Sequence, residues 1–413
     1  MPVMTHDFSP GRRTVTRSAL LGSAALLLGA GGRARAASAA SAATRGPGDA
    51  VLVLPAPTGR HRVGCQSVYL VDTSRRDPLT PEFPVRELML TVFYPARDIT
   101  GLARAPQLTP QVAFWLGQIG PHTPLQLPGS GVDWGATLSH SFTGAPALPG
   151  RRPVLVYSPG GGDSRGLGTC LAEDLASHGA VVVTIDHPGD AVAVEFPGVT
   201  PFRQDPVRTT VLRGDPRDQP AFWRTLIDTR IADLHFVLDR LGHAAGLPLP
   251  DGLADALDLR RLGVYGHSAG GSATTEVLHE NHRVRAGVNL EGYLDHPPAA
   301  PGDSPEPFPI TTEGTDRPLL LLGSEGFDRR RELDRSWSAL AARSGRRVHE
   351  ARVADAGHWV FSDYAAMLPQ LQSSGLMTPA VRNRVIGALA PTVSVPRVRH
   401  ALRGFFTRHL ATT

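Results

Sequence analysis

The stretch that decides the fold is LGVYGHSAGGSATTEVL, residues 262–278. Leu262–Tyr265 is a short apolar run typical of a buried strand, and an apolar helical pattern follows Ser268. Gly266 and Gly270 flank this serine in the motif G-x-S-x-G, in which a sharp strand-to-helix turn exposes the serine oxygen above a sheet. The start of a helix also favours the negative charge that an attacking serine develops. We therefore predict that Ser268 is a nucleophile.

A second match to the motif, GDSRG at Gly162–Gly166, lacks the strand that such a turn requires. The preceding predicted strand, Pro153–Tyr157, ends several residues earlier, so Ser164 is expected on a loop. The glycine-rich approach to this loop suits an oxyanion hole, because glycines let backbone N–H groups come close to a developing negative charge. One donor usually comes from this loop and the other from the residue after the nucleophile. We therefore predict Gly161 and Ala269 as the two donors.

Short apolar strands alternate with helices along the middle of the chain. The predicted strands are Val85–Tyr94, Pro153–Tyr157, Ala180–Ile185, Leu262–Tyr265, Ala286–Leu290, Leu319–Leu322 and Arg347–Val353, and the predicted helices include Leu167–His178, Thr225–Leu241 and Trp337–Arg343. This alternation predicts an α/β fold, in which helices cover both faces of a mostly parallel sheet. Active sites in such folds gather at the carboxyl ends of the strands. Residues 97–150, rich in Pro and Gly, are expected to be irregular.

A serine nucleophile needs a general base, usually histidine, and a carboxylate that orients the imidazole ring. Folds that carry the serine on such a strand-to-helix turn have these residues in the order serine, acid, histidine along the chain. His358 follows the last predicted strand and is therefore predicted to be the base. Three carboxylates between the serine and the histidine follow the end of a predicted strand: Glu291 follows the strand that ends at Leu290, while Glu325 and Asp328 follow the next strand. Position alone does not separate these alternatives.

Residues 1–36 have the features of an export signal. The pair Arg12–Arg13 precedes an apolar run, Ala19–Ala30, and a small-x-small cleavage pattern follows it. The paired arginines indicate the twin-arginine route. The apolar run is shorter than the roughly 20 residues that cross a bilayer, which argues against a membrane anchor. We therefore expect a secreted protein in which a flexible lead-in, 37–50, precedes a single domain at 51–413.

Charge and cysteine content narrow the classes of function. The formal net charge is +4, and the predicted leader accounts for all of it because it holds five arginines and one aspartate. The remaining chain is balanced and contains no lysine, so it lacks the electrostatic footprint of a nucleic-acid-binding protein. Export would permit a disulfide between the two cysteines, Cys65 and Cys170, and two separate thiols are the alternative. The sequence contains no H-E-x-x-H, C-x-x-C or P-loop motif.

Six segments of the sequence together indicate a protein family. Their order and spacing along the chain are more specific for that family than any single segment is. They are PTGRHRVGCQSVYLVD (57–72), PVLVYSPGGGDSRGLGTCLAEDLASHGAVVVTIDH (153–187), GHSAGGSAT (266–274), VRAGVNLEGYL (284–294), PLLLLGSEGFD (318–328) and GHWVFSDY (357–364). Together they resemble the plasma-type, isoform II-like platelet-activating factor acetylhydrolases, which have the α/β-hydrolase fold. The resemblance extends from about residue 55 to about residue 365.

The resemblance implies an ester hydrolase that uses no metal or cofactor and removes short acyl chains from phospholipid-like esters. It also places the acid 23 residues after the nucleophile, which favours Glu291, although the family usually has an aspartate there. In the oxyanion loop, Pro159 and Gly161 stand where the family has a histidine and a bulkier residue. The shape of the oxyanion hole, and with it the fit of the substrate, is therefore expected to differ.

The segments around the predicted site leave several alternatives open. Gln111–Ile119 and Trp134 fall where the similar family has lipid-interface helices, and they suit either weak contact with a membrane surface or a flap packed on the body. Phe196–Phe202 and Phe222–Trp223 are expected to roof the pocket. The sequence thus predicts a secreted serine esterase acting on a small-molecule or lipid ester. A broad carboxylesterase, lipase or polyester hydrolase is the alternative, and a non-catalytic binding protein on a hydrolase scaffold is a more distant one.

Overall fold

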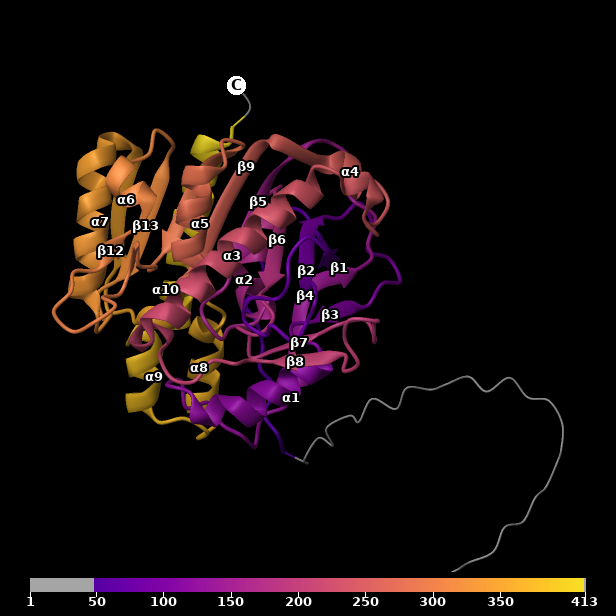
Figure 1. Cartoon of the computed structure of the whole chain (residues 1–413). Helices are drawn as coiled ribbons and strands as arrows, with labels where there is room; N and C mark the ends of the chain where they lie inside the picture. The colour runs from indigo at the N-terminus through magenta and orange to yellow at the C-terminus, as the bar shows by residue number, and fades with distance from the viewer. Residues whose placement is uncertain (1–47, 412–413) are drawn as a thin grey trace, which may run out of the picture. The chain divides into compact units, whose positions relative to one another are not determined.

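A ten-stranded sheet forms the centre of the computed structural model, which describes residues 48–411 (Figure 1). In sheet order the strands are β14 (Val348–Val353), β13 (Leu319–Ser324), β10 (Val284–Leu290), β9 (Leu257–His267), β5 (Arg152–Ser158), β6 (Val181–Asp186), β2 (Arg86–Pro95), β1 (Val63–Asp72), β4 (Leu138–Thr143) and β3 (Arg104–Pro106). Neighbouring strands from β14 to β6 are parallel, whereas β2 is antiparallel to both β6 and β1. The predicted leader, 1–36, and most of the lead-in lie outside the described residues.

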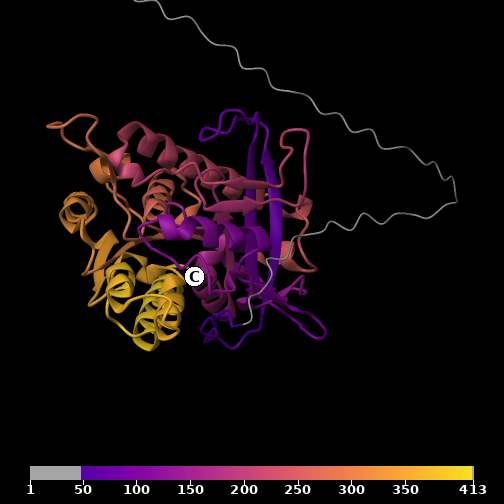
Figure 2. The same ribbon diagram turned by 90° about the horizontal axis from the view of Figure 1, so that it is seen from below.

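Helices cover both faces of this sheet (Figures 1 and 2). They are α1 (Pro110–Ile119), α2 (Thr169–Ser177), α3 (Pro220–Leu241), α4 (Leu253–Ala256), α5 (Ala269–Glu280), α6 (Pro309–Glu313), α7 (Arg330–Ser344), α8 (Tyr364–Ser373), α9 (Pro379–Ile386) and α10 (Pro391–His409). Buried residues of α3, α5 and α7 form a core cluster on one face, and those of α2 and α10 form a second cluster on the other. The predicted α/β-hydrolase fold is confirmed.

A smaller core cluster lies where α1, α8 and α9 meet (Figure 1). Val112 and Leu116 of α1 pack there with side chains of α8 and α9, and Trp134 is buried in the same cluster. On the outer side of α1, Phe114 is 45% exposed. The segment Gln111–Ile119 is therefore a helix packed on the body, as the flap alternative expects. Within the described residues, no helix is long and apolar enough to cross a membrane.

Residues 97–150 are more regular than predicted. Besides α1, this segment contains β4, which runs parallel to β1, and β3, which pairs with β4 at the edge of the sheet. The pairing of β4 with β1 covers only three residues on each strand, Val63–Cys65 and Ser141–Thr143. The two buried residues of β4 are Ser139 and Ser141, whereas Leu138 is exposed, so the strand has no apolar alternation that could be recognised in the sequence.

Both cysteines are buried free thiols, so the structure has the two separate thiols and no disulfide between them. Cys65 lies on β1 and Cys170 on α2. Burial raises the pKa of Cys65 to about 12 and raises that of Cys170 well above its usual value. Since the thiolate is the reactive form of cysteine, neither side chain is activated for chemistry.

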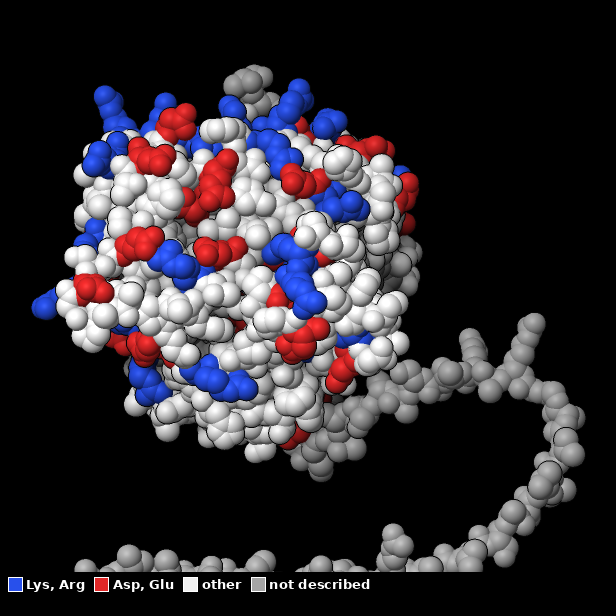
Figure 3. Space-filling model, in the orientation of Figure 1, with Lys and Arg blue, Asp and Glu red and all other residues white. Residues whose placement is uncertain are grey.

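The surface mixes charges of both signs. Figure 3 shows arginines beside acidic residues over the face that carries α3 and α5. Exposed ion pairs on the surface include Arg283 with Asp239 and Arg224 with Glu306. Such interspersed charges partly cancel, so this face does not present an extended field of one sign.

The contact between α5 and the end of β5 leaves no space for a side chain. A Cβ atom at Gly270 would lie 2.0 Å from the Ser158 carbonyl oxygen and 2.5 Å from that of Pro159. A Cβ atom at Gly266 would lie 2.2 Å from the carbonyl oxygen of Gly270. Protein interiors are close-packed, and atoms cannot approach at such distances. Packing therefore requires both glycines of the G-x-S-x-G motif.

We expect Gly270→Ala to destabilise the protein by about 3 kcal/mol or more, because the added methyl group must displace the end of β5. Gly404→Ala is the matched control, since Gly404 lies in α10 and a Cβ atom there would meet nothing within 4 Å. The higher helix propensity of alanine should stabilise that variant by about 0.5–1 kcal/mol. Urea unfolding followed by circular dichroism measures both, and equal stabilities would contradict the packing constraint.

Candidate active site

Ser268 lies on a strained turn between β9 and α5. Its backbone angles are φ 51° and ψ −122°, a conformation that costs a non-glycine residue about 1–3 kcal/mol. The Ser268 N–H donates to the Leu290 carbonyl at 2.9 Å, which ties the turn to the neighbouring strand β10. Ser268 is partly exposed, although His267 and Ala269 on either side are buried. The serine thus stands clear of the sheet edge at the start of a helix.

A hydrogen bond of 2.8 Å joins Nδ1 of His358 to Oε2 of Glu291. Glu291 directly follows β10, has a positive φ of 62° and is fully buried. Its carboxylate also accepts the hydroxyl of Ser324, at 2.8 and 2.9 Å, and the Ser324 N–H. Ser324 is the last residue of β13, the next strand of the sheet. Two neighbouring strands therefore hold the carboxylate against the imidazole.

The two other candidate acids, Asp328 and Glu325, lie on the surface. Asp328 is exposed and accepts the Arg329 N–H at 3.1 Å. Glu325 is also exposed. In the part of the chain that the structure describes, neither side chain hydrogen-bonds to His358. Of the three alternatives, the structure brings only Glu291 to the histidine.

Aromatic rings surround the His358 imidazole. Phe327 stacks on it, with ring centroids 4.6 Å apart and an interplanar angle of 16°. The His267 ring lies at 4.7 Å and the Trp359 ring at 5.0 Å. Sequence reasoning did not single out Phe327 or His267, because one aromatic residue beside a motif carries no pattern of its own.

His267 also fixes the loop that carries His358. Its Nε2 lies 2.9 Å from the His358 carbonyl oxygen. Burial lowers the pKa of His267, which favours the neutral ring, and Nε2–H is then the donor to that carbonyl. Since His267 immediately precedes Ser268, the histidine loop is held directly beside the strained turn.

Gly161 and Ala269, the two predicted oxyanion donors, lie side by side. A Cβ atom at Gly161 would be 3.9 Å from the Ala269 Cβ. Ala269 begins α5, and the first N–H groups of a helix have no acceptor within the helix. Among the described residues, none accepts the Gly161 N–H. Two unpaired N–H groups therefore lie next to Ser268, where they can bind a negatively charged oxygen.

The second motif match, GDSRG, forms a structural turn. Ser164 is only 2% exposed and caps the 3-10 helix Arg165–Gly168 by accepting the Gly166 N–H at 3.4 Å. The Ser164 hydroxyl donates to Asp186 at 3.2 Å, and Arg165 forms an ion pair with the same carboxylate. A buried serine that caps a helix is not available to attack a substrate.

The predicted roof of the pocket is placed differently by the structure. Phe196 and Trp223 are buried in the core, where the Trp223 ring lies 6.5 Å from the ring of Tyr293. Leu212 lies beside the oxyanion loop, and its Cδ1 would be 3.6 Å from a Cβ atom at Gly162. Apolar residues in an insertion indicate burial, but they do not indicate which part of the body they cover.

Asp363 anchors the far end of the histidine loop. Its carboxylate accepts the Cys170 N–H at 2.9 Å and the Gln107 amide at 2.8 Å. Its own N–H donates to the Leu167 carbonyl at 2.8 Å. Burial raises the pKa of this carboxyl group to about 7. The loop that carries His358 is thus tied to the start of α2 through a buried, titratable group.

Comparisons with known proteins place the chain among hydrolases. Residues 49–196 match the family model described as platelet-activating factor acetylhydrolase, isoform II. A probable 1-alkyl-2-acetylglycerophosphocholine esterase of Arthroderma benhamiae is 26% identical over 381 residues, which are 86% of this chain and 87% of that protein. The platelet-activating factor acetylhydrolase of Bos taurus is 24% identical over 204 residues, which are 42% of this chain and 40% of that protein. The chain is thus similar to the platelet-activating factor acetylhydrolase isoform II family.

A solved structure of a second esterase is also similar to this chain. The ferulic acid esterase from Streptomyces cinnamoneus is 30% identical, with a TM-score of 0.63 over 87% of this chain and 93% of that chain. The family resemblance predicted from six segments is confirmed. The chain is a carboxylic ester hydrolase, as predicted.

We expect the contribution of Asp363 to the stability of this esterase to fall as the pH rises from about 4 to about 7, because the folded protein keeps a proton on this carboxyl group that the unfolded chain has lost. Asp363 contributes at most about 1.4 kcal/mol per pH unit to this slope. Asp363→Asn should remove that contribution, whereas Asp303→Asn, at an exposed site, should keep the wild-type slope. Urea unfolding at a series of pH values measures the slopes, and an unchanged slope for Asp363→Asn would contradict the assignment.

Proposed function

We propose that this hydrolase is a serine esterase in which Ser268, His358 and Glu291 form the catalytic triad and the N–H groups of Gly161 and Ala269 bind the oxyanion. The observation that carries the proposal is the 2.8 Å hydrogen bond between His358 and Glu291 beside the strained Ser268 turn. Strain of this kind persists only where the surrounding structure enforces it, and it is common at catalytic sites. The order serine, acid, histidine along the chain also supports the proposal.

In the proposed reaction, the Ser268 oxygen attacks the ester carbonyl while His358 Nε2 accepts the hydroxyl proton. Glu291 holds the imidazole by its Nδ1–H and stabilises the imidazolium that forms. The carbonyl oxygen becomes an oxyanion between the Gly161 and Ala269 N–H groups, each worth about 3–4 kcal/mol in comparable sites. The intermediate collapses as His358 returns the proton to the leaving alcohol. Water, deprotonated by His358, then cleaves the acyl-enzyme and regenerates the serine.

The substrate class we propose is a phospholipid-like ester with a short acyl chain. Its support is the family and the names of two relatives, both of which refer to acetylated glycerophospholipids. A specific observation favours a broader carboxylesterase as the second candidate, because the solved relative at 30% identity is named for ferulic acid esters. The glycine at position 161, where the family has a bulkier residue, also opens the oxyanion side of the site. Export by the signal predicted in residues 1–36 belongs to the same proposal and rests on the sequence.

Acyl preference tests this function. We expect p-nitrophenyl acetate and a 1-alkyl-2-acetylglycerophosphocholine to be hydrolysed faster than p-nitrophenyl octanoate or methyl ferulate. Ser268→Ala should lower kcat by about 10⁴-fold or more, whereas Ser164→Ala, which changes the other motif serine, should keep kcat within a few-fold. Faster turnover of octanoate or ferulate would favour the second candidate. Failure of the wild type to react with a fluorophosphonate, or full activity of Ser268→Ala, would contradict a serine esterase.

Replacing the acid tests the triad separately. Glu291→Gln keeps the size of the side chain but lets its amide face the imidazole, which favours the wrong tautomer and should lower kcat by about 10³–10⁴-fold. Asp328→Asn is the matched control and should keep kcat within about twofold, since this carboxylate is exposed. Steady-state kinetics with p-nitrophenyl acetate measures both variants. A large loss of kcat in Asp328→Asn, with little change in Glu291→Gln, would assign the acid to Asp328.

A further inference from the structure

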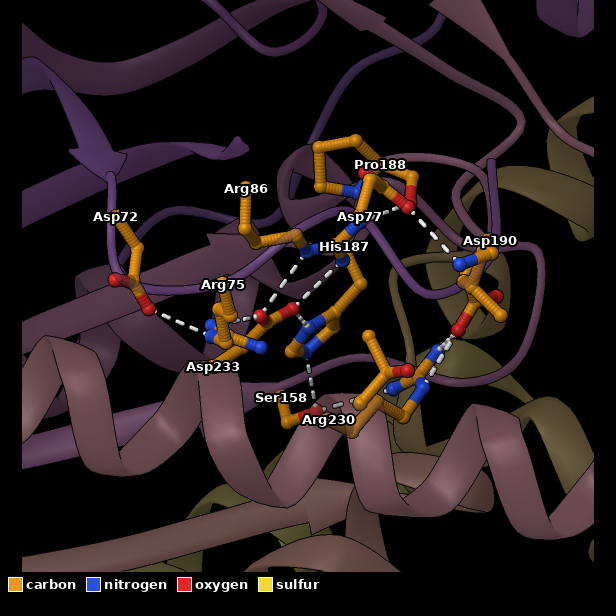
Figure 4. Close-up of polar contacts among 12 residues, drawn as sticks. Asp72, Arg75, Asp77, Arg86, Ser158, His187, Pro188, Asp190, Arg230 and Asp233 are labelled. Atoms are coloured by element: carbon orange, nitrogen blue, oxygen red, sulfur yellow. Dashed lines mark hydrogen bonds and ion pairs between the residues drawn. The ribbon is translucent and has the colours of Figure 1, made fainter. Parts of the chain in front are cut away.

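A cluster of buried charged side chains lies directly behind the oxyanion loop, and the reaction described above does not use it (Figure 4). Helix α3 contributes Arg230 and Asp233, and the segment after β6 contributes His187 and Asp190. All four are at most 1% exposed. Buried charges are costly unless hydrogen bonds and opposite charges satisfy them. The hydrogen bonds of this cluster lead to the loop that carries Gly161.

Arg230 holds the backbone of the oxyanion loop. Its guanidinium donates to the Pro159 carbonyl at 2.6 Å and to the Gly160 carbonyl at 3.0 Å. Its Nε–H donates to one oxygen of Asp190 at 2.6 Å. The other oxygen of Asp190 accepts the Gly162 N–H at 2.8 Å. The Arg230–Asp190 ion pair therefore holds the peptide groups on both sides of the oxyanion donor.

The contact with the Gly160 carbonyl sets the direction of the Gly161 N–H. These two groups belong to one peptide unit, which is planar and trans, so its C=O and N–H point in opposite directions. While Arg230 holds the oxygen, the N–H must point away from the guanidinium. The Asp163 N–H donates to the same oxygen at 3.1 Å and further restrains the peptide plane.

The loop needs such a restraint because it contains three consecutive glycines, 160–162. Glycine adopts positive and negative φ with similar ease, so side-chain sterics do little to prevent a peptide flip here. A flip would turn the N–H away from the developing oxyanion. A cation bound to the carbonyl oxygen also polarises the amide, which strengthens its N–H as a donor. Arg230 can therefore affect both the direction and the strength of the hydrogen bond to the oxyanion.

A buried chain of hydrogen bonds holds Arg230 in turn. The Ser158 hydroxyl accepts from Arg230 at 3.0 Å and lies 2.9 Å from His187 Nε2. His187 Nδ1 lies 2.8 Å from Asp233, which also accepts from Arg86 at 2.7 Å. Burial lowers the pKa of His187, so the neutral ring donates from Nδ1 to Asp233, and its Nε2 accepts a hydrogen bond from the Ser158 hydroxyl. Ser158 is fully buried, so this second set of serine, histidine and aspartate is closed to an ester.

We infer that Arg230 and Asp190 are positioning residues for ester hydrolysis, which aim and strengthen the Gly161 N–H toward the oxyanion. The inference rests on the proposed function, because it takes Gly161 as an oxyanion donor. The carbonyl oxygen of a bound ester carries little charge, whereas the tetrahedral intermediate carries a full one. Loss of the Arg230–Asp190 contact should therefore lower kcat and leave KM nearly unchanged.

Arg230→Lys tests the inference, because lysine keeps the positive charge but lacks the planar guanidinium group. It therefore cannot donate to two carbonyl groups and a carboxylate in the same geometry. We expect kcat/KM for p-nitrophenyl acetate to fall by about 10²-fold, with KM changed by no more than about threefold. A trifluoromethyl ketone adds the Ser268 oxygen to its carbonyl carbon, the proton passes to His358, and a tetrahedral oxyanion results. Its inhibition constant should rise by the same factor as kcat/KM falls. Partial loss of folded protein would lower the apparent kcat without changing that constant.

Arg203→Lys is the matched control. Arg203 is likewise buried, donates to Glu87 at 3.1 Å and donates to the Asp205 carbonyl at 2.5 Å. Its kcat/KM and inhibition constant should stay close to the wild-type values. A second test variant, Asp190→Asn combined with Arg230→Met, removes both buried charges together and avoids leaving one unpaired. This variant should show the same fall in kcat/KM and the same rise in the inhibition constant as Arg230→Lys.

Unchanged kcat/KM and inhibition constant in Arg230→Lys would overturn the inference. Loss of folding in both Arg230 variants would also overturn it, because the pair would then belong to the scaffold. Ser268→Ala distinguishes these outcomes from failure of the proposed function. If Ser268→Ala is inactive while Arg230→Lys is unaffected, only the positioning inference fails; if Ser268→Ala is active, the proposed function fails.

Discussion

The contact between α5 and the carbonyl groups at the end of β5 determines where the rest of the site lies. Gly270 meets the Ser158 carbonyl with no room for a side chain, so α5 begins directly beside the oxyanion loop. The chain must then turn within one residue, and Ser268 takes the strained conformation that this requires. The same approach brings Ala269 next to Gly161. The position of the proposed nucleophile and that of the proposed oxyanion donors therefore follow from one packing constraint.

In the part of the chain that the structure describes, two sets of serine, histidine and carboxylate differ in burial, and burial separates the roles that we propose for them. Ser268 and His358 are partly exposed, so a substrate and water can reach them. Ser158 and His187 lie behind the loop, and their hydrogen-bonding groups are occupied by Arg230 and by a buried aspartate. The residue types are alike, whereas access and hydrogen-bond saturation differ. Residue type alone therefore does not identify a reactive serine, as the buried Ser164 of the second motif match also illustrates.

Features with a local signal could be predicted from the sequence, and features that depend on distant contacts could not. The strand, glycines and helix around Ser268 follow one another directly, so the turn and the sheet were predictable. The acid was ambiguous because three carboxylates follow neighbouring strands, and the contacts that hold Glu291 come from Ser324, 33 residues away. Arg230 reaches a carbonyl 70 residues away, and nothing in its helix pattern distinguishes it from a surface arginine. The strand β4 was missed because serines occupy its buried positions, which leaves no apolar pattern in the sequence.

Glu291 and Ser324 also suggest a route by which related enzymes diverge. The two residues end neighbouring strands, and their side chains meet beside the imidazole of His358. A carboxylate at the end of either strand would therefore lie near the same ring nitrogen. Exchange of the two residue types would transfer the acid from one strand to the next while the serine and the histidine stayed in place. The proposed reaction requires a carboxylate at this ring nitrogen, and either strand could supply it.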